Sequence, residues 1–349
     1  MKSSLSLAAL FAAALVSLVA PAYADGAEDQ KAVLITGATS GIGRYATERL
    51  ANAGYFVYAG ARKDADMEEL NKIDNVMAVR IDVTKQDQID AAVALVEKQG
   101  RGLWGVVNNA GVNVVAPMIV ADISDLEFLF DVNVFGVFRV TKAFAPLVIE
   151  SQGRIVNISS ISGVLSGGGY GIYAGTKHAV EAFTDATARE LEQFGVFVAA
   201  VNPGNYASEI GLTRCKRLLA DTDAEDWGAF EERRQQMITG CRERLEAGVQ
   251  GEGVPPDAVA AAIEQALFEE NPRKRYLVVP RQEEAGWTIA KILEEMLVLN
   301  VGHEYTYTRE ELIEFIDAYW PFASGEKSWS NEADEKQMEE FMNAWMQKQ

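Results

Sequence analysis

Short apolar runs alternate with helical patterns from Lys31 onward, and this alternation restricts the possible folds more than any other feature of the chain. The apolar runs are candidate strands at 32–35, 56–59, 76–81, 105–107, 154–158 and 196–201. Between them, helical spacing extends over about 43–53, 67–72 and 86–99, and again from about 173. Continuous apolar strands separated by helices are typical of parallel strands that are buried on both faces. The sequence therefore predicts an α/β fold with a doubly wound parallel sheet.

Two regions depart from this alternation. Residues 205–255 are rich in charge and contain no clear strand, so we expect helices inserted after the sixth strand. Residues 282–349 form a C-terminal helical extension, which begins with an amphipathic helix near 287–300. A length of 349 residues would allow two domains, but an α/β domain often reaches ~250 residues. We therefore predict one domain over 25–281, followed by the extension.

The first 24 residues have the pattern of a secretory signal peptide. Lys2 precedes an apolar run, and Ala22-Tyr23-Ala24 gives an Ala-x-Ala cleavage pattern before Asp25. An uncleaved membrane anchor is the alternative, but the apolar run is shorter than the ~20 residues that span a bilayer. We predict a signal peptide at 1–24, export to the periplasm and no stable membrane span in the mature protein. If the segment is not functional, the protein would be cytoplasmic.

Composition excludes two classes of function. With 51 acidic and 32 basic residues the net charge is −19, whereas a protein that binds nucleic acid needs a basic surface. The two His and two Cys residues are too widely spaced for a zinc-finger type site, so no metal is expected. Hydrophobic residues make up 48% of the chain, which is enough for a sizeable core.

A glycine-rich segment follows the first predicted strand and opens the first predicted helix. Its spacing is Gly-x₃-Gly-x-Gly, and its residues are Gly37, Thr39, Ser40, Gly41, Ile42 and Gly43. Glycines let backbone amides approach a pyrophosphate closely, and a helix N-terminus adds partial positive charge. A tight turn without a ligand is the alternative. The position between strand and helix favours a Rossmann-like dinucleotide site.

The residues after the second predicted strand bear on which dinucleotide is bound. An acidic side chain here would hold the ribose 2′-hydroxyl of NAD, but the sequence has Ala61 followed by Arg62 and Lys63. We expect Arg62 to contact the 2′-phosphate, so NADP is the predicted cofactor and NAD is less favoured. A solvated arginine on a surface turn remains the alternative.

A tyrosine and a lysine lie four residues apart in a helical pattern, at Tyr173 and Lys177, and so share one helix face. A nearby ammonium favours the phenolate and would lower the pKa of Tyr173 from its ordinary value of ~10. Ser160 lies at the end of the 154–158 strand, where open α/β sheets place groups that contact ligands. Its hydroxyl could donate a hydrogen bond to a substrate oxygen.

These residues make the sequence resemble the short-chain dehydrogenase/reductase family. The resemblance covers about residues 31–204 and includes Gly37, Gly41, Gly43, Asp82, Val83, Asn108, Asn109, Ala110, Gly111, Asn133, Ser160, Tyr173, Lys177, Pro203 and Gly204, in the order of the family. Segments 101–105 and 203–206 look more like the branch of retinol, hydroxysteroid and 3-hydroxybutyrate dehydrogenases. The fold it implies agrees with the fold predicted above.

The resemblance implies a role for each of these residues. Tyr173 would be the general acid and base, Lys177 would lower its pKa and hold the nicotinamide ribose, and Ser160 would bind the carbonyl oxygen. Asn133 would hold a water in the proton relay. The remaining positions would line the cofactor groove: Asp82, Val83, Asn109, Ala110, Gly111, Pro203 and Gly204. Where the family often has a threonine after Pro-Gly, Ser208 is the plausible substitute.

The inserted segment 205–255 lies where the family covers its substrate, so we call it the lid. Its apolar residues could form the roof of an apolar pocket or could simply pack on the body: Ile210, Leu212, Leu218, Leu219, Trp227, Phe230, Met237 and Ile238. Cys215 and Cys241 could pair, as suits an exported protein, or could be two buried thiols.

The predicted function is thus an NADP(H)-dependent oxidoreductase that interconverts a secondary alcohol and a ketone or aldehyde. The partner would be a small apolar carbonyl or alcohol substrate, and the resemblance implies a homodimer or homotetramer. A non-catalytic dinucleotide-binding sensor or scaffold is the alternative. A complete set of Asn133, Ser160, Tyr173 and Lys177 favours the enzyme, because a binding protein has no need of acid–base groups.

Overall fold

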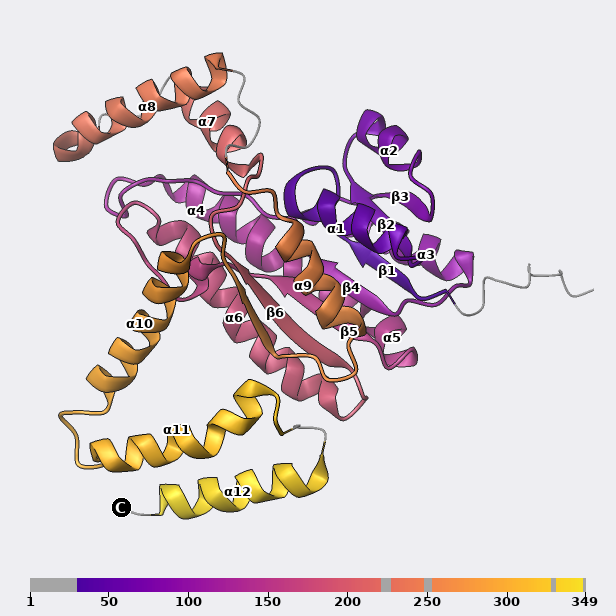
Figure 1. Cartoon of the computed structure of the whole chain (residues 1–349). Helices are drawn as coiled ribbons and strands as arrows, with labels where there is room; N and C mark the ends of the chain where they lie inside the picture. The colour runs from indigo at the N-terminus through magenta and orange to yellow at the C-terminus, as the bar shows by residue number, and fades with distance from the viewer. Residues whose placement is uncertain (1–29, 221–226, 248–252, 328–330, 348–349) are drawn as a thin grey trace, which may run out of the picture.

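The computed structural model describes residues 30–220, 227–247, 253–327 and 331–347 (Figure 1). The predicted signal peptide, 1–24, lies outside the described residues, so export to the periplasm stays a prediction.

A sheet of seven parallel strands forms the centre of the molecule, in the order β3-β2-β1-β4-β5-β6-β7. The strands are β1 (Ala32–Ile35), β2 (Phe56–Ala61), β3 (Val76–Arg80), β4 (Gly105–Asn108), β5 (Arg154–Ile158), β6 (Phe197–Pro203) and β7 (Arg275–Val278). The six predicted strands are present, and the doubly wound α/β fold is confirmed. β7, at the edge of the sheet beside β6, was not predicted.

The strand order reverses at β1, which pairs with β2 on one side and with β4 on the other. In a parallel sheet this reversal opens a crevice at the carboxyl ends of the two strands, because their following helices leave to opposite faces. The glycine-rich segment follows β1, and Asn108 ends β4. The topology therefore places the predicted dinucleotide site at this crevice.

Helices cover both faces of the sheet and bury its apolar side chains. One face packs against α1 (Gly41–Asn52), α2 (Asp64–Leu70) and α9 (Asp257–Phe268). The other packs against α3 (Gln86–Gln99), α5 (Gly136–Glu150) and α6 (Gly171–Glu192). Strands β1 and β2 are buried throughout, as expected for strands with helices on both sides.

One helical segment preceding β5 is interrupted by a π-helical turn. It consists of α4 (Ile123–Phe130), the turn at Asp131–Phe135 and α5. By length and composition alone, Ile123–Glu150 could cross a membrane, and it is the one such helix among the described residues. In this structure, however, α5 packs on β4 and β5, as a core helix does.

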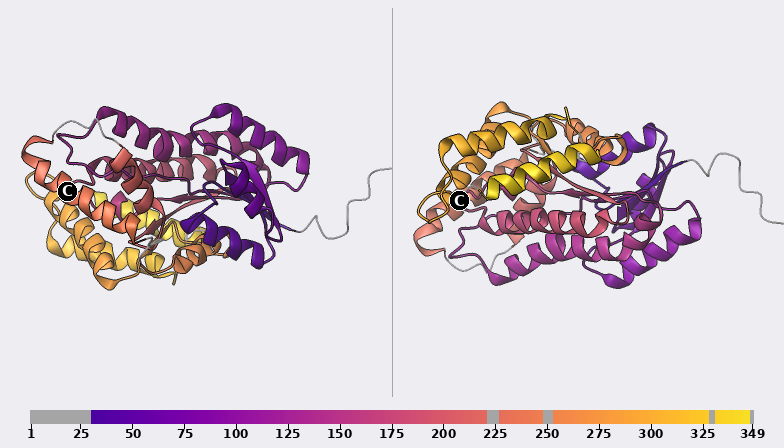
Figure 2. Two further views of the ribbon diagram at one scale, coloured as in Figure 1. Left: turned by 90° about the horizontal axis from the view of Figure 1, so that it is seen from above. Right: turned by 90° about the horizontal axis from the view of Figure 1, so that it is seen from below.

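The lid and the extension are helical, as predicted. The lid contains α7 (Ile210–Ala220), a 3-10 turn (Gly228–Phe230) and α8 (Glu231–Glu246), and a second 3-10 turn (Ile161–Gly163) follows β5. The extension contains α10 (Gln282–Leu299), α11 (Arg309–Ser324) and α12 (Glu332–Met346), so its first helix begins five residues before the predicted start. Figures 1 and 2 show the extension leading away from the body, on the side of the sheet opposite α5 and α6.

Cys215 and Cys241 form a disulfide that joins α7 to α8, with their Cα atoms 5.1 Å apart. The sequence left open whether these residues pair or stay as thiols. Both are buried between the two helices. The domain boundaries at 25, 205, 255 and 282 stay predictions.

Candidate active site

The glycine-rich segment turns tightly between β1 and α1. Gly37 and Gly41 have φ of +65° and +51°, a conformation that other residues rarely adopt. A Cβ on Gly43 would lie 2.2 Å from the carbonyl oxygen of Gly37, so only glycine fits there. Ser40, the N-cap of α1, makes no side-chain capping bond, and the first-turn amides are thus available to an anion. Thr39 and Ile42 complete the turn.

The end of β4 fixes the shape of this turn. The side-chain amide of Asn109 donates to the carbonyl oxygens of Thr36 and Gly37, at 2.9 and 3.0 Å. In return, the Thr36 hydroxyl oxygen accepts from the backbone N–H groups of Asn109 and Ala110, both at 3.0 Å. Asn109 was predicted to line the cofactor groove, and its side chain contacts the loop that borders the groove.

Ser160, Tyr173 and Lys177 come together at the carboxyl end of β5. Ser160 lies two residues after the end of β5, and its side chain is hydrogen-bonded to that of Tyr173. Lys177 lies one turn further along α6 and is buried, with its Nζ 2.8 Å from the carbonyl oxygen of Ile158 and 5.7 Å from the centre of the Tyr173 ring. The structure therefore brings the three predicted residues together, and their catalytic roles stay predictions.

Burial dominates the protonation of this cluster. It raises the pKa of Tyr173 to about 12, although the hydrogen bond with Ser160 acts in the opposite direction. Burial also lowers the pKa of Lys177 to about 8, against the influence of the Glu181 carboxylate, which raises it. We expected Lys177 to lower the pKa of Tyr173. In this structure the pKa of Tyr173 instead lies above its ordinary value, because desolvation of the phenolate is the largest influence on it, and the role of Lys177 in lowering it stays a prediction.

Asn133 lies in the π-helical turn and connects α6 to the end of β4. Its Oδ1 accepts from the backbone N–H of Val112 at 2.8 Å, and its Nδ2 donates to the Val112 carbonyl and to the Thr176 hydroxyl. A Cβ on Gly111 would lie 3.5 Å from Asn133 Oδ1 and 3.9 Å from Lys177 Nζ. The side chain of Asn133 is thus committed to protein groups, beside the lysine.

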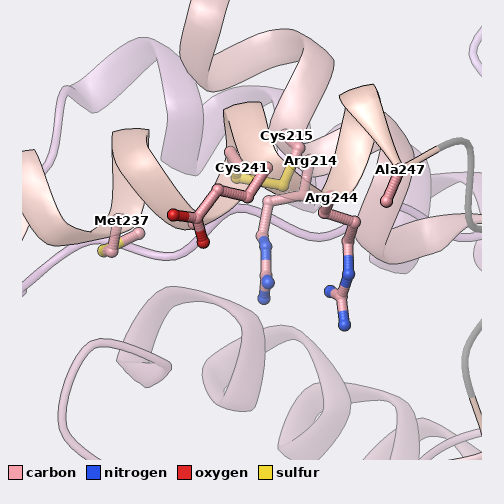
Figure 3. A pocket seen from close by; sticks show the side chains of 8 residues that line it. Arg214, Cys215, Met237, Cys241, Arg244 and Ala247 are labelled. Atoms are coloured by element: carbon pink, nitrogen blue, oxygen red, sulfur yellow. A yellow bond between two sulfur atoms is a disulfide. The ribbon is translucent and has the colours of Figure 1, made fainter.

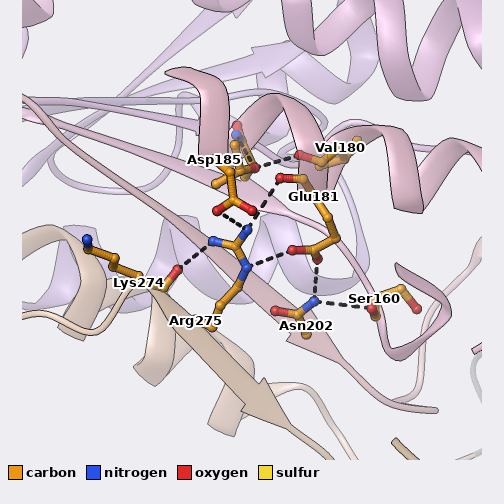
Figure 4. Close-up of polar contacts among 9 residues, drawn as sticks. Ser160, Val180, Glu181, Asp185, Asn202, Lys274 and Arg275 are labelled. Carbon is orange, nitrogen blue, oxygen red and sulfur yellow. Dashed lines mark hydrogen bonds and ion pairs between the residues drawn. The ribbon is translucent and has the colours of Figure 1, made fainter. Parts of the chain in front are cut away.

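A charged network lies next to the cluster of Ser160, Tyr173 and Lys177, as Figure 4 shows. The Glu181 carboxylate accepts from Arg275 Nε at 2.7 Å and from Asn202 Nδ2 at 2.5 Å. Asn202 also donates to the backbone carbonyl of Ser160 at 3.3 Å, and Arg275 pairs with Asp185 at 2.6 Å. The network therefore joins β7 and α6 to Ser160, two residues after the end of β5.

The adenosine end of the crevice is marked by Arg62 and Asp82, at the ends of β2 and β3. Burial alone would raise the pKa of Asp82, but hydrogen bonds from Thr84 and the charges of Arg62 and Lys85 hold it below its ordinary value. Arg62 Nη1 lies 3.9 Å from Asp82 Oδ2, and its side chain is 69% exposed. Most of the guanidinium is therefore open to a ligand. Val83, next along, is buried against Gly136.

The other end of the crevice is formed by residues 203–208, after β6. Pro203 still pairs with Val278 of β7, and Gly204 donates its N–H to the Val278 carbonyl at 2.8 Å. A Cβ on Gly41 would lie 3.4 Å from Cβ of Ser208, so this segment lies across from the glycine-rich loop. Pro203, Gly204 and Ser208 thus occupy the predicted side of the groove.

A cavity of about 530 Å³ lies within the lid, between α7 and α8. Figure 3 shows the guanidinium groups of Arg214 and Arg244 pointing the same way beside the disulfide. Arg214 Nη1 lies 3.4 Å from the hydroxyl of Tyr170, which precedes α6. Of the apolar residues predicted to form a roof, Met237 lines this cavity, whereas Ile238 is buried. Lid residues alone line this cavity, so the predicted apolar roof over a substrate stays a prediction.

The sequence analysis missed Glu181, Arg275 and Glu284. Glu181 lies one helical turn after Lys177, which could have marked it as a neighbour of the site. Glu284, in the first turn of α10, is buried and accepts from the backbone N–H of Asn205. No local signal distinguishes it from the exposed Glu283 beside it.

The fold and the crevice define a dinucleotide-binding α/β protein, and comparison with known proteins narrows this class. Residues 31–216 match the model of the short chain dehydrogenase family. Retinol dehydrogenase 16 of Homo sapiens is 35% identical over 272 residues, which cover 75% of this chain and 82% of that protein. Mitochondrial D-beta-hydroxybutyrate dehydrogenase of Rattus norvegicus is 31% identical over 268 residues, which cover 70% of this chain and 76% of that protein. The chain belongs to the short-chain dehydrogenase family and is an oxidoreductase near this branch.

Solved structures agree with this assignment. A short-chain dehydrogenase from Streptomyces avermitilis is 28% identical, with a TM-score of 0.63, over 78% of this chain and 95% of that chain. Other structures of the same fold were solved with NAD in one case and with NADPH in another. These structures hold either dinucleotide, so the likeness does not select one for this chain.

Proposed function

We propose that this chain is an NADP(H)-dependent oxidoreductase that interconverts a secondary alcohol and a ketone or aldehyde, with Tyr173 as general acid and base. The observation that carries the proposal is the cluster of Ser160, Tyr173 and Lys177 at the carboxyl end of β5, beside the glycine-rich loop. The crevice brings together a serine hydroxyl, a tyrosine and a buried ammonium group. Together these groups can transfer a proton to or from a bound substrate.

The groove fits a dinucleotide. Its loop has two glycines of positive φ, and a side chain at Gly41 would reach into the space between loop and Ser208. When bound, the nicotinamide supplies or accepts the hydride. The residues that would hold the cofactor are Gly37, Thr39, Ser40, Gly41, Ile42, Gly43, Arg62, Asp82, Val83, Asn109, Ala110, Gly111, Tyr173, Lys177, Pro203, Gly204 and Ser208.

The protonation of Tyr173 suits carbonyl reduction. With its pKa at about 12, the phenol is protonated at neutral pH and can donate to the carbonyl oxygen, which Ser160 would orient by a hydrogen bond. Lys177 would bind the nicotinamide ribose and stabilise the phenolate that remains. Oxidation of an alcohol requires this phenolate at the start, so a high pKa disfavours it at neutral pH. Asn133, whose side chain is hydrogen-bonded to Val112 and Thr176, would hold a water of the proton relay.

The preference for NADP(H) rests on Arg62. Its guanidinium is largely exposed at the adenosine end, and Ala61 leaves no acidic side chain to repel a phosphate. The test is a fluorescence titration of the protein with NADPH and, separately, with NADH. We expect NADPH to bind more tightly, and Arg62→Ala to lose this difference by about tenfold or more. Lys63→Ala, at the exposed neighbour, is the matched control.

The same titration, combined with an activity assay, distinguishes an enzyme from a non-catalytic sensor or scaffold. If NADPH binds but no carbonyl in a broad panel is reduced, the protein is a dinucleotide sensor or scaffold. If Arg62→Ala keeps the NADPH/NADH affinity ratio, the assignment of Arg62 is wrong. If neither dinucleotide binds, the proposed function itself fails.

We further propose an apolar substrate under the lid and a homodimer or homotetramer. The lid cavity is lined by Arg214 and Arg244 as well as by Met237, so a panel should include apolar ketones with and without a carboxylate.

Phe138 of α5 and Phe183 of α6 are 56% and 39% exposed, with ring centres 6.5 Å apart. Such an exposed aromatic pair supports contact with a second copy, and light scattering would measure the assembly.

A further inference from the structure

A buried carboxylate at the start of the extension contacts the end of the cofactor groove. Glu284 lies in the first turn of α10, and its side chain is 0% exposed. One oxygen, Oε1, accepts from Nε and Nη2 of Arg281, at 2.8 and 2.7 Å. The other, Oε2, accepts from the backbone N–H of Asn205 at 2.8 Å. This carboxylate therefore joins α10 to a segment that lies 79 residues earlier in the chain.

The approach of Glu284 depends on a glycine. A Cβ at Gly204 would lie 2.0 Å from Glu284 Oε2, and 3.0 Å from Cγ1 of Val279. Any side chain at 204 would thus displace the carboxylate. A carboxylate removed from water costs several kcal/mol unless it is well paired, and an apolar side chain would pack the start of α10 without that cost. Arg281 pairs with one oxygen of this buried carboxylate, and the other oxygen binds the backbone N–H of Asn205.

That backbone group belongs to the segment that follows β6. Three hydrogen bonds fix the segment: Gly204 N–H to the Val278 carbonyl, Asn205 N–H to Glu284, and Ala207 N–H to the Val254 carbonyl. Glu284 supplies the central one, and it is the one made by a side chain. Ser208 follows directly and lies across from Gly41. A shift at Asn205 would move this side of the groove relative to the glycine-rich loop.

We propose that Glu284 is a positioning residue for the cofactor: the first turn of the extension holds the 203–208 segment in the place where it receives the nicotinamide end. This inference rests on the proposed dinucleotide function. It makes the extension part of the cofactor site, although α10 leads away from the body (Figure 1). The adenosine end, at Arg62 and Asp82, lies at β2 and β3 on the other side of β1 and would not be affected.

The experiment compares two ligands in full-length variants. We would measure by calorimetry the affinity of wild type, Glu284→Ala, Glu284→Gln and Gly204→Ala for NADPH and for 2′-phospho-ADP-ribose, which lacks the nicotinamide. We expect Glu284→Ala and Gly204→Ala to bind NADPH about tenfold more weakly, and to bind the fragment as wild type does. Glu284→Gln keeps an oxygen for Asn205 and should lose less. Glu283→Gln, exposed on the same turn, is the control and should match wild type for both ligands.

Each outcome decides the question. Unchanged affinity of Glu284→Ala for NADPH would overturn the inference, and so would an equal loss for NADPH and the fragment, because that pattern indicates general damage to the fold. If wild type itself binds neither ligand, the proposed function fails, and the inference with it. If wild type binds both, only the inference is at stake.

Discussion

The sheet body and the outer helical regions are constructed differently. In the body, a single site residue such as Asn109 is fixed by several contacts from separate elements, and the strands around it are fully buried. In the extension, α10 exposes much of its apolar surface, with Trp287 and Leu299 at 55% and 75%. Its buried residues are Glu284 and Thr288, both near its start. Site residues in the body are thus held by several contacts each, whereas the outer helices depend on a few specific contacts.

This difference separates the residues proposed for the chemical step from those expected to adjust ligand binding. The proposed acid–base cluster belongs to strand ends and helices of the body, where close packing restricts movement. The disulfide joins the two lid helices α7 and α8 to each other, and the Glu284 carboxylate joins the extension to the segment after β6, so a change there should alter binding more than the chemical step. Changes in the two regions therefore have different expected effects.

The largest effect is expected in the body, from Tyr173→Phe. Removing the hydroxyl removes the proton donor, so kcat for carbonyl reduction should fall by about 10²–10⁴-fold. The affinity for NADPH should stay within a few fold, because the ring remains. Steady-state kinetics and the fluorescence titration measure the two quantities. Tyr170→Phe, on a partly exposed tyrosine three residues earlier, is the control and should retain activity. Substantial turnover by Tyr173→Phe would show that another group donates the proton.

The second prediction concerns how the free energy of unfolding of the body depends on the protonation of Lys177. Its pKa is about 8 in the folded protein, against 10.5 as the ordinary value. Between these values the unfolded chain binds one more proton than the folded protein, so the free energy of unfolding rises with pH. Relative to Lys177→Met, wild type should therefore gain up to about 3 kcal/mol from pH 8 to 10.5. Chemical denaturation across this range measures the difference. A difference that is flat with pH would mean that the folded pKa is not lowered.

Much of the body could be predicted from sequence, since the fold and the local pattern favour the same structure there. The strands at 32–35 and 154–158 and the helix at 86–99 are found as predicted. β7 was missed because it has four residues at the sheet edge, of which only Tyr276 is fully buried. Glu181 and Glu284 were missed for a different reason: a charged residue in a helix usually faces solvent, and only tertiary packing shows otherwise. The pKa of Tyr173 likewise depends on burial, which spacing does not give.

The third prediction tests how the disulfide holds the two lid helices together. The disulfide closes a loop of 26 residues, for which the chain-entropy estimate is about 3.5 kcal/mol. Replacing both cysteines, in Cys215→Ala/Cys241→Ala, should release α7 and α8 locally and leave the sheet intact. Limited proteolysis within 210–247 should accelerate by an order of magnitude or more, while the melting temperature of the body changes by only a few degrees. Wild type treated with a thiol reductant should behave like the double variant. An equal loss of stability in the lid and in the body would mean that the two regions unfold as one unit.

The smallest effect should come from Glu181→Gln, which changes the charge behind the cluster and little else. The Glu181 carboxylate raises the pKa of Lys177, so its removal should lower that pKa further below about 8. If charged Lys177 supports the reaction, the alkaline limb of the pH–rate profile should move to lower pH by about half a unit or more, with kcat at pH 6 nearly unchanged. Asp185→Asn is the matched control, because Asp185 also pairs with Arg275 but is 66% exposed. Its profile should stay at the wild-type position. A shift of equal size in both variants would mean that the network acts through Arg275 and the packing of β7, rather than through the charge that Lys177 experiences.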